Sequence, residues 1–377
     1  MDFPEGKSLE EAFAMAEAEA LLKQVRERAA ARLSAATAPD NRCEDWRFGR
    51  PLTYAAELLA AMAPGRRSAG RVQLQAPEDI TDTPDDEWRM EEEMMPTLGS
   101  DAILAAHVQR FGEGVCLFLE EDTEYPDPIV ITYETDSLFT PSTFILAAPG
   151  AKAHIIERHI THGSGIMVTT RCVRAMQGAE LSLELQEQGS GESRCMNISS
   201  LAADQAVIRH LTTHENHAWA REETVAEITG STEEQRADIR LYSANRLAQH
   251  QVLDQHTRQI HLCGHSFSDL LYKNVADDHA AATFAGMIYV APGAHRTDAY
   301  QANRNMLLSE KATVHSLPGL EILADHVRCS HGSASSPMDE EQLFYLLSRG
   351  IPRHEAQMLV ADGFLEDAVT RFRTSES

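Results

Sequence analysis

Two side chains that can bind iron stand two positions apart near the end of the chain, in the stretch VRCSHG. In a β-strand, residues i and i+2 point to the same face, so Cys329 and His331 would hold their Cβ atoms about 6.5 to 7 Å apart. This separation suits neighbouring irons of one cluster, or ligation shared with a second chain, and two ligands are too few for a closed site. The competing interpretation is an ordinary buried thiol, because Val327 shares the parity of Cys329 and would normally face a core.

Other residues with ligand chemistry are more scattered. Among 17 histidines, three groups stand out: His154, His159 and His162; His210, His214 and His217; and His256, His261 and His265. Neutral imidazole binds zinc, iron and copper, but a histidine in a polar strand or turn is commonly an ordinary surface residue.

Carboxylates in the same region raise a different class of function, a polysaccharide lyase or hydrolase. The candidates are Asp254, Asp269, Asp277, Asp278 and Asp298. Such an enzyme needs two or three carboxylates within several ångströms of one another, and no spacing in the sequence brings a particular pair together.

The composition of the chain and the motifs that it lacks exclude several classes of function. The sequence has no Walker lysine motif, no GxGxxG opening a helix, no GxSxG elbow and no HExxH. Its 58 acidic and 33 basic side chains give a formal net charge of −25, which repels nucleic-acid phosphates and anionic lipid. The first residues, MDFPEGKSLEEAF, lack a basic and apolar leader, and no apolar stretch approaches the roughly 20 residues of a membrane span. We therefore expect a cytoplasmic protein whose 6 scattered cysteines are reduced.

The elements that position these residues fall into three regions. Residues 8–36 predict one long helix, with Ser8 and Glu11 as a capping box, and residues 53–62 a short one. Residues 76–96 are acidic and predict a solvated connector. From about 100 to 335, short runs that alternate apolar with polar residues predict many β-strands, which suit a β-solenoid, a large sandwich or a barrel.

The chain returns to helix after Pro337. Asp339 can cap EEQLFYLLSR, Gly350 can end it in the left-handed conformation, and Pro352 suits the first turn of the helix RHEAQMLVADGF. The apolar residues of this hairpin are Leu343, Phe344, Leu347, Met358, Leu359 and Phe364. So small a hairpin cannot bury them all internally, so it docks either on the β-domain or on a partner.

Residues 270–350 resemble the C-terminal part of the SufB/SufD family of iron–sulfur assembly proteins. The similar elements are Gly286 with IYV, TDAYQANRNMLLS, PGLEILAD, CSHG and FYLLSRGIP, in that order. Within the family, VRCSHG, the N-terminal CEDWRFGRP and the chain length are most like SufD. Residues 100–270 match only in general character.

The resemblance implies a right-handed parallel β-helix core (100–336) between an N-terminal helical region with its acidic connector (1–99) and a C-terminal helical region (337–377). It also implies a non-catalytic scaffold that pairs with a SufB-like subunit through the β-helix. A SufC-like ATPase would dock on the C-terminal helices around Phe344, Tyr345, Arg349 and Gly350 and would hydrolyse the ATP.

By the same resemblance, Cys329 and His331 would be transient ligands of a cluster at the interface with the SufB-like partner, and the isolated chain would hold no cluster tightly. Whether the chain forms a homodimer without its partner is left open. His326 stands where the family often has an acidic residue, SASS replaces the usual turn, and segment 76–96 has no counterpart. Strand parity places His326 opposite to Cys329, which favours a surface residue over an added ligand. The alternatives are a β-helix polysaccharide enzyme and a purely structural subunit.

Overall fold

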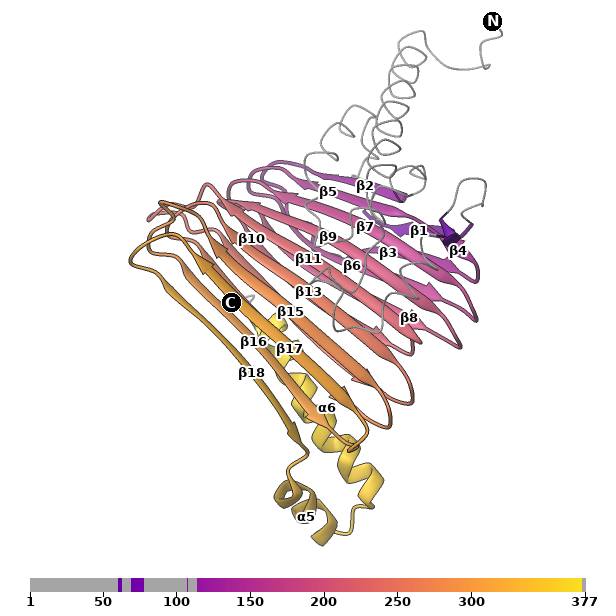
Figure 1. Cartoon of the computed structure of the whole chain (residues 1–377). Coiled ribbons are helices and arrows are strands. Elements are labelled where there is room, and N and C mark those ends of the chain that lie inside the picture. Colours follow the sequence, from indigo (N-terminus) through magenta and orange to yellow (C-terminus); the bar gives the residue numbers. More distant parts are fainter. Residues whose placement is uncertain (1–59, 63–68, 78–106, 108–113, 375–377) are drawn as a thin grey trace, which may run out of the picture.

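The chain folds mainly into two facing β-sheets. The structure is a computed structural model, which describes residues 60–62, 69–77, 107 and 114–374. From β5 onward, consecutive strands alternate between the sheets, so each pair of strands completes one coil and the coils stack along one axis (Figure 1). Neighbouring strands are parallel, except at the start of the first sheet, where β1 pairs antiparallel with β3. The predicted parallel β-helix is confirmed.

The strands have the following bounds. The first sheet contains β1 (Arg71–Gln75), β3 (Ile129–Thr135), β6 (Lys152–Thr161), β8 (Glu180–Gly189), β10 (Val207–Glu215), β12 (Asp238–Leu247), β14 (Phe267–Ala276), β16 (Asp298–Leu307) and β18 (Arg328–Pro337). The second sheet contains β2 (Gly114–Leu119), β4 (Leu138–Phe139), β5 (Ser142–Ala147), β7 (Ile166–Ala175), β9 (Arg194–Asp204), β11 (Trp219–Thr229), β13 (Val252–His261), β15 (Ala281–Val290) and β17 (Thr313–Ile322).

The length of a coil varies along the axis. Lys152 on β6 pairs with Glu180 on β8, 28 residues later. Further along, Asn274 on β14 pairs with Asn305 on β16, 31 residues later. A period that changes from coil to coil leaves no strict sequence repeat, which is why periodicity alone did not separate a solenoid from a sandwich or a barrel.

One corner of the β-helix is built from residues in the left-handed conformation. His265, Arg296 and His326 have φ angles of 57°, 60° and 57°, and each stands two residues before a strand of the first sheet. The N–H of Arg296 donates to the carbonyl of His326 in the next coil, at 3.1 Å. His326 is exposed, so it is a corner residue of the surface, as strand parity favoured.

The interior is filled by side chains that alternate along the strands. The main core cluster runs through both sheets and includes Leu117, Ile131, Leu183 and Ile239, each almost fully buried. These residues follow the two-residue period that predicted the strands.

The C-terminal hairpin consists of α5 (Glu340–Ser348) and α6 (Arg353–Thr374). As predicted, the carboxylate of Asp339 accepts the N–H of Glu341 at 2.9 Å and caps α5, and Gly350 follows α5 with a φ of 83°. The α6 helix continues ten residues beyond Phe364, where the predicted pattern stopped, because its last turns have the β-helix to pack on.

Helix α6 lies along the outer face of the first sheet, across β10, β12 and β14 (Figure 1). Phe372 is 1% exposed and packs with Leu211, Tyr242 and Leu271. The ammonium of Lys273 on β14 lies 2.7 Å from the carboxylate of Asp367 on α6. The hairpin therefore docks on the β-domain. Of the two expected ways to bury its apolar residues, on the β-domain or on a partner, the first holds for most of them.

The structure describes only a small part of the N-terminal region, residues 1–99, that was predicted as helices and an acidic connector. Strand β1 falls in the N-terminal region, where only helices and a connector were predicted; its sequence RVQLQ does alternate polar with apolar residues, but it is only 5 residues long. The predicted helix 8–36, most of helix 53–62 and residues 78–96 of the acidic segment lie outside the described part of the chain. Among the described helices, none is long and apolar enough to cross a membrane.

Candidate functional site

Cys329 and His331 lie on β18, the last strand of the first sheet. They stand in register with Ala299 and Gln301 of β16, which are both buried and face the interior. Cys329 and His331 therefore share the inward face of the last coil, as their spacing predicted. Only one side of β18 is covered by another strand, so this end of the β-helix is open (Figure 1).

The thiol of Cys329 is half-buried. With Val327 and Leu320 it packs against a buried cluster that contains Ile288 and Ala299. Burial raises the pKa of the Cys329 thiol, a backbone hydrogen bond at Ala299 opposes the rise, and the charge of Asp298 adds to it. The thiol therefore stays protonated near neutral pH until a metal ion binds it.

The imidazole of His331 is exposed, because no further described coil covers this face of β18. Beneath it in the stack, Gln301 lies across Gly286 of the second sheet. A Cβ atom at Gly286 would be 2.6 Å from Oε1 of Gln301, so a larger residue there would force the end of the Gln301 side chain to move.

The strands at the open end carry unpaired backbone groups on one edge. Each of β17 and β18 is the terminal strand of its sheet. A row of unpaired N–H and C=O groups is a template for pairing with another chain. The two candidate ligands thus sit on the edge that a partner would cover.

Two aromatic residues of the hairpin point away from the β-helix. Leu343 is buried, whereas Phe344 is 72% exposed and Tyr345 57% exposed. The guanidinium of Arg349 lies 5.1 Å above the ring of Tyr345, and Gly350 then turns the chain into α6. The four residues predicted to bind a partner therefore lie between the middle of α5 and the turn that follows it, and Phe344 and Tyr345 are exposed there.

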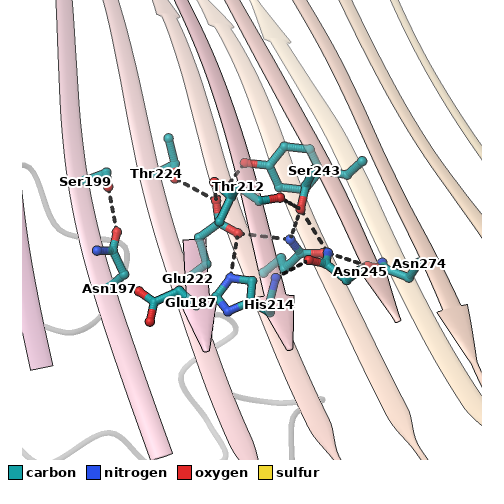
Figure 2. A network of polar contacts seen from close by, with 12 residues as sticks. Glu187, Asn197, Ser199, Thr212, His214, Glu222, Thr224, Ser243, Asn245 and Asn274 are labelled. Carbon is teal, nitrogen blue, oxygen red and sulfur yellow. Dashed lines mark hydrogen bonds and ion pairs between the residues drawn. The ribbon is translucent and has the colours of Figure 1, made fainter. Parts of the chain in front are cut away.

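The interior also holds a polar network that the sequence did not predict (Figure 2). Its centre is the buried carboxylate of Glu222, which accepts hydrogen bonds from the hydroxyl of Tyr272 at 2.9 Å and the amide of Gln255 at 3.0 Å. Nε2 of His214 lies 3.4 Å from Oε2 of Glu222, the same oxygen that accepts the hydrogen bond from Gln255. The neighbouring charges and hydrogen bonds outweigh burial and lower the pKa of Glu222 to about 2, so it stays ionised inside the β-helix.

An amide ladder leads from this network to the last strand. The side-chain N–H of Asn245 donates to Asn274 at 2.8 Å, Asn274 donates to Asn305 at 3.0 Å, and Asn305 donates to the hydroxyl of Ser335 at 3.2 Å. These four residues stand in register on β12, β14, β16 and β18. Because β12, β14 and β16 each offer the same amide and β18 offers a hydroxyl, each donor meets an acceptor in the next coil.

The first histidine group does not converge. His159 is buried with Nε2 2.7 Å from Glu157 and Nδ1 2.6 Å from Glu187. Burial alone would lower the pKa of His159, but the two carboxylates outweigh it and raise the pKa to about 9. His154 and His162 each face a different carboxylate.

The third group is held by separate partners. Nε2 of His256 lies 2.8 Å from Asp254, which also pairs with Arg221, and His261 bonds to Ser266 at 2.7 Å. Asp254 is thereby held in a buried ion pair. The carboxylate of Asp298 pairs instead with Arg236, away from Asp254.

The second group partly converges. His214 and His217 approach Cys195 so that one ligand atom from each lies within 4.8 Å of the others, whereas His210 contacts Arg171. Sequence reasoning found the histidines and missed the cysteine, because Cys195 lies on another strand and only the register of the coils joins them.

Comparison with known proteins agrees with this architecture. Residues 130–364 match the family described as the SufBD core domain of SUF system FeS cluster assembly. The chain is 30% identical over 231 residues to the iron–sulfur cluster assembly protein SufD of Escherichia coli, across 60% of this chain and 53% of that protein. It is 39% identical over 113 residues to SufD of Bacillus subtilis, and 40% identical over 118 residues to a SufBD family protein of Synechocystis.

The matched part spans about half of the Escherichia coli protein and 26% of each of the other two relatives. The family match covers well over half of this chain, from β3 into α6, and includes β18 with Cys329 and His331. The chain belongs to the SufBD family of the SUF system for iron–sulfur cluster assembly.

Proposed function

We propose that the chain is a non-catalytic scaffold subunit, most like SufD, on which iron–sulfur clusters are assembled. A cluster would be bound transiently by Cys329 and His331, with the remaining ligands supplied by a SufB-like partner. The observation that carries the proposal is the placement of both residues on one inward face of the terminal strand, at an open end of the β-helix. Thiolate and imidazole are both ligands of iron in such clusters.

The incomplete ligand set supports an interface rather than a closed site. Two side chains satisfy half of an iron's coordination, and the raised pKa of Cys329 means that the thiol gives up its proton only when iron is bound. The edges of β17 and β18 supply backbone groups for pairing with the partner. In the absence of that partner, the same edge would support a homodimer.

The α5 end of the hairpin is the proposed docking surface for a SufC-like ATPase. Phe344 and Tyr345 are exposed there beside Arg349, while α6 is committed to the β-helix. Since the sequence has no phosphate-binding loop, ATP would be hydrolysed by that subunit. The energy would reach this chain as a change of shape in the complex.

The test uses the assembled complex. The chain is co-expressed with its SufB-like and SufC-like partners and reconstituted anaerobically, and absorption is followed at about 420 nm, where thiolate-to-iron charge transfer appears. We expect Cys329→Ala and His331→Ala to form clusters at least several-fold more slowly than wild type. Cys263→Ala is the matched control, because Cys263 is also partly buried but lies in another coil.

Three outcomes are informative. Slow assembly in both variants, with a normal control, supports the proposal. Wild-type rates in both variants would overturn the site, although the family membership would stand. A variant Cys329→Ala that loses thermal stability but assembles clusters normally would instead favour a purely structural role for this thiol.

A further inference from the structure

A second set of ligand atoms lies deep in the β-helix, far along the coil stack from Cys329. It consists of Sγ of Cys195 on β9, a ring nitrogen of His214 on β10 and a ring nitrogen of His217 in the turn between β10 and β11. These three atoms lie within 4.8 Å of one another. The residues are 1%, 2% and 3% exposed, so water does not compete freely for them.

Within the described part of the chain, the imidazole of His217 has no hydrogen-bond partner. Both of its ring nitrogens are buried and unpaired there, and Nδ1 of His214 is unpaired as well. A buried polar atom without a partner costs about 1 to 3 kcal/mol, and such groups in native proteins point to an absent ion or water. An unpartnered buried imidazole beside a buried thiol and a second imidazole thus indicates that something binds between them.

Glu187 on β8 lies next to this set, within hydrogen-bonding reach of the Cys195 thiol. Its Oε1 is 2.6 Å from Nδ1 of His159, and its charge acts on Cys195, His214 and His217. Burial opposes ionisation of Glu187, but attraction and hydrogen bonding by His159 outweigh burial and lower its pKa to about 2. Figure 2 shows Glu187 beside His214, at the end of the polar network. A carboxylate fixed by a second hydrogen bond is typical of a metal ligand.

The backbone leaves room for the imidazole of His217. A Cβ atom at Gly189, the last residue of β8, would lie 2.7 Å from the ring carbons of His217. The ring therefore lies directly on the glycine backbone, where a larger residue would displace it.

We propose that Cys195, His214, His217 and Glu187 form a resident site for one divalent transition-metal ion, with Zn²⁺ as the ion that fits best. One sulfur, two imidazole nitrogens and one carboxylate oxygen are the ligand types and number of a closed tetrahedral zinc site. The ion would join β8, β9, β10 and the turn before β11. The proposal is independent of the scaffold function, since it involves none of the residues at the open end.

The full-length chain, purified without partners and treated with a chelator, is titrated with Co²⁺. We expect one equivalent to bind, with the ligand-field bands of tetrahedral Co²⁺ and a thiolate-to-metal charge-transfer band. Competition with Zn²⁺ and, anaerobically, with Fe²⁺ then decides which ion the site prefers. Zn²⁺ is also expected to raise the melting temperature, because it binds the folded state.

Two variants and two controls assign the binding. Cys195→Ala and His217→Gln are each expected to weaken binding about a hundredfold or more. Cys195→Ala should abolish the charge-transfer band, and His217→Gln should abolish the tetrahedral spectrum. Cys172→Ala, another buried cysteine on the adjacent strand β7, and Cys329→Ala should bind as wild type does. Glu187→Gln provides a milder variant that retains the hydrogen-bonding shape.

The proposal is overturned if the folded wild-type chain binds no Co²⁺ or Zn²⁺ at micromolar concentration, as checked by circular dichroism and equilibrium dialysis. It is also overturned if Cys195→Ala or Glu187→Gln, each shown to be folded, retains wild-type affinity and spectrum. A preference for Fe²⁺ over Zn²⁺ would support the site and correct its metal.

Discussion

The carboxylate of Asp254 on β13 and the guanidinium of Arg221 on β11 form an ion pair that is buried between coils of the β-helix. Nε2 of His256 lies 2.8 Å from the other oxygen of the same carboxylate, and Glu223 faces the opposite side of Arg221 at 2.7 Å. The single guanidinium of Arg221 therefore faces two buried carboxylates, and these charges depend on one another. Removing one of them leaves another without compensation.

The first prediction concerns stability in acid. Burial opposes ionisation of Asp254, but His256 and Arg221 outweigh it and lower the pKa of the carboxyl. A lowered pKa stabilises the folded state above the ordinary aspartate pKa of about 4, and that contribution is lost as the pH falls below it. We expect Asp254→Asn to cost about 3 kcal/mol at pH 7 and to flatten the acid limb of the stability curve.

Urea unfolding at several pH values between neutral and acid checks this prediction. Asp298→Asn, at the surface, is the control. Parallel curves for wild type and Asp254→Asn would contradict the expected pH dependence.

The second prediction concerns the amide ladder. Asn274→Ala removes the acceptor of Asn245 and the donor to Asn305, both of them buried. Two unpaired amide groups cost about 1 to 3 kcal/mol each. Hydrogen exchange should show weaker protection in β12 and β16, whereas Asn305→Ala should mainly affect β14 and β18. A loss below about 0.5 kcal/mol would show that the ladder contributes little.

The third prediction concerns helix α6. Phe372→Ala empties the pocket formed with Leu211 and Tyr242 and should cost about 3 kcal/mol, because a buried aromatic side chain is lost. Limited proteolysis should then cleave the hairpin sooner than the β-helix. Phe344→Ala, on an exposed residue of α5, should change the stability by less than about 0.5 kcal/mol. Equal protection of α6 in wild type and Phe372→Ala would mean that other contacts hold the helix.

The fourth prediction concerns the ATPase. The double variant Phe344→Ala and Tyr345→Ala should weaken binding of the SufC-like subunit at least tenfold in calorimetry, since exposed aromatic residues contribute most to such interfaces. Leu262→Ala, an exposed apolar residue of the β-helix, is the control. Unchanged affinity in the double variant would place the ATPase on another surface.

The sequence predicted those parts of the fold that depend on local chemistry. Alternating residues predicted the strands, Asp339 and Gly350 predicted the limits of α5, and parity placed Cys329 and His331 on one face. The choice of a β-helix required the family resemblance, because the coil length changes from 28 to 31 residues.

The interior polar groups were hidden from sequence reasoning for a physical reason. Asn274 and Glu222 are buried although polar residues normally face water, and each is satisfied by partners one or more coils away. The approach of Cys195 to His214 likewise depends on the register of the strands, which no local pattern reports. Contacts between residues of different coils could therefore not be predicted from the sequence and became visible only in the structure.

The most direct test of the central claim asks whether Cys329 and His331 bind iron in the assembled complex. Mössbauer spectra of the anaerobically reconstituted complex, labelled with ⁵⁷Fe, compare wild type with Cys329→Ala, His331→Ala and His331→Cys. We predict that both alanine variants lose the cluster signal, and that His331→Cys keeps a cluster with altered parameters, because thiolate replaces imidazole on one iron. A wild-type spectrum in all three variants would contradict the assignment.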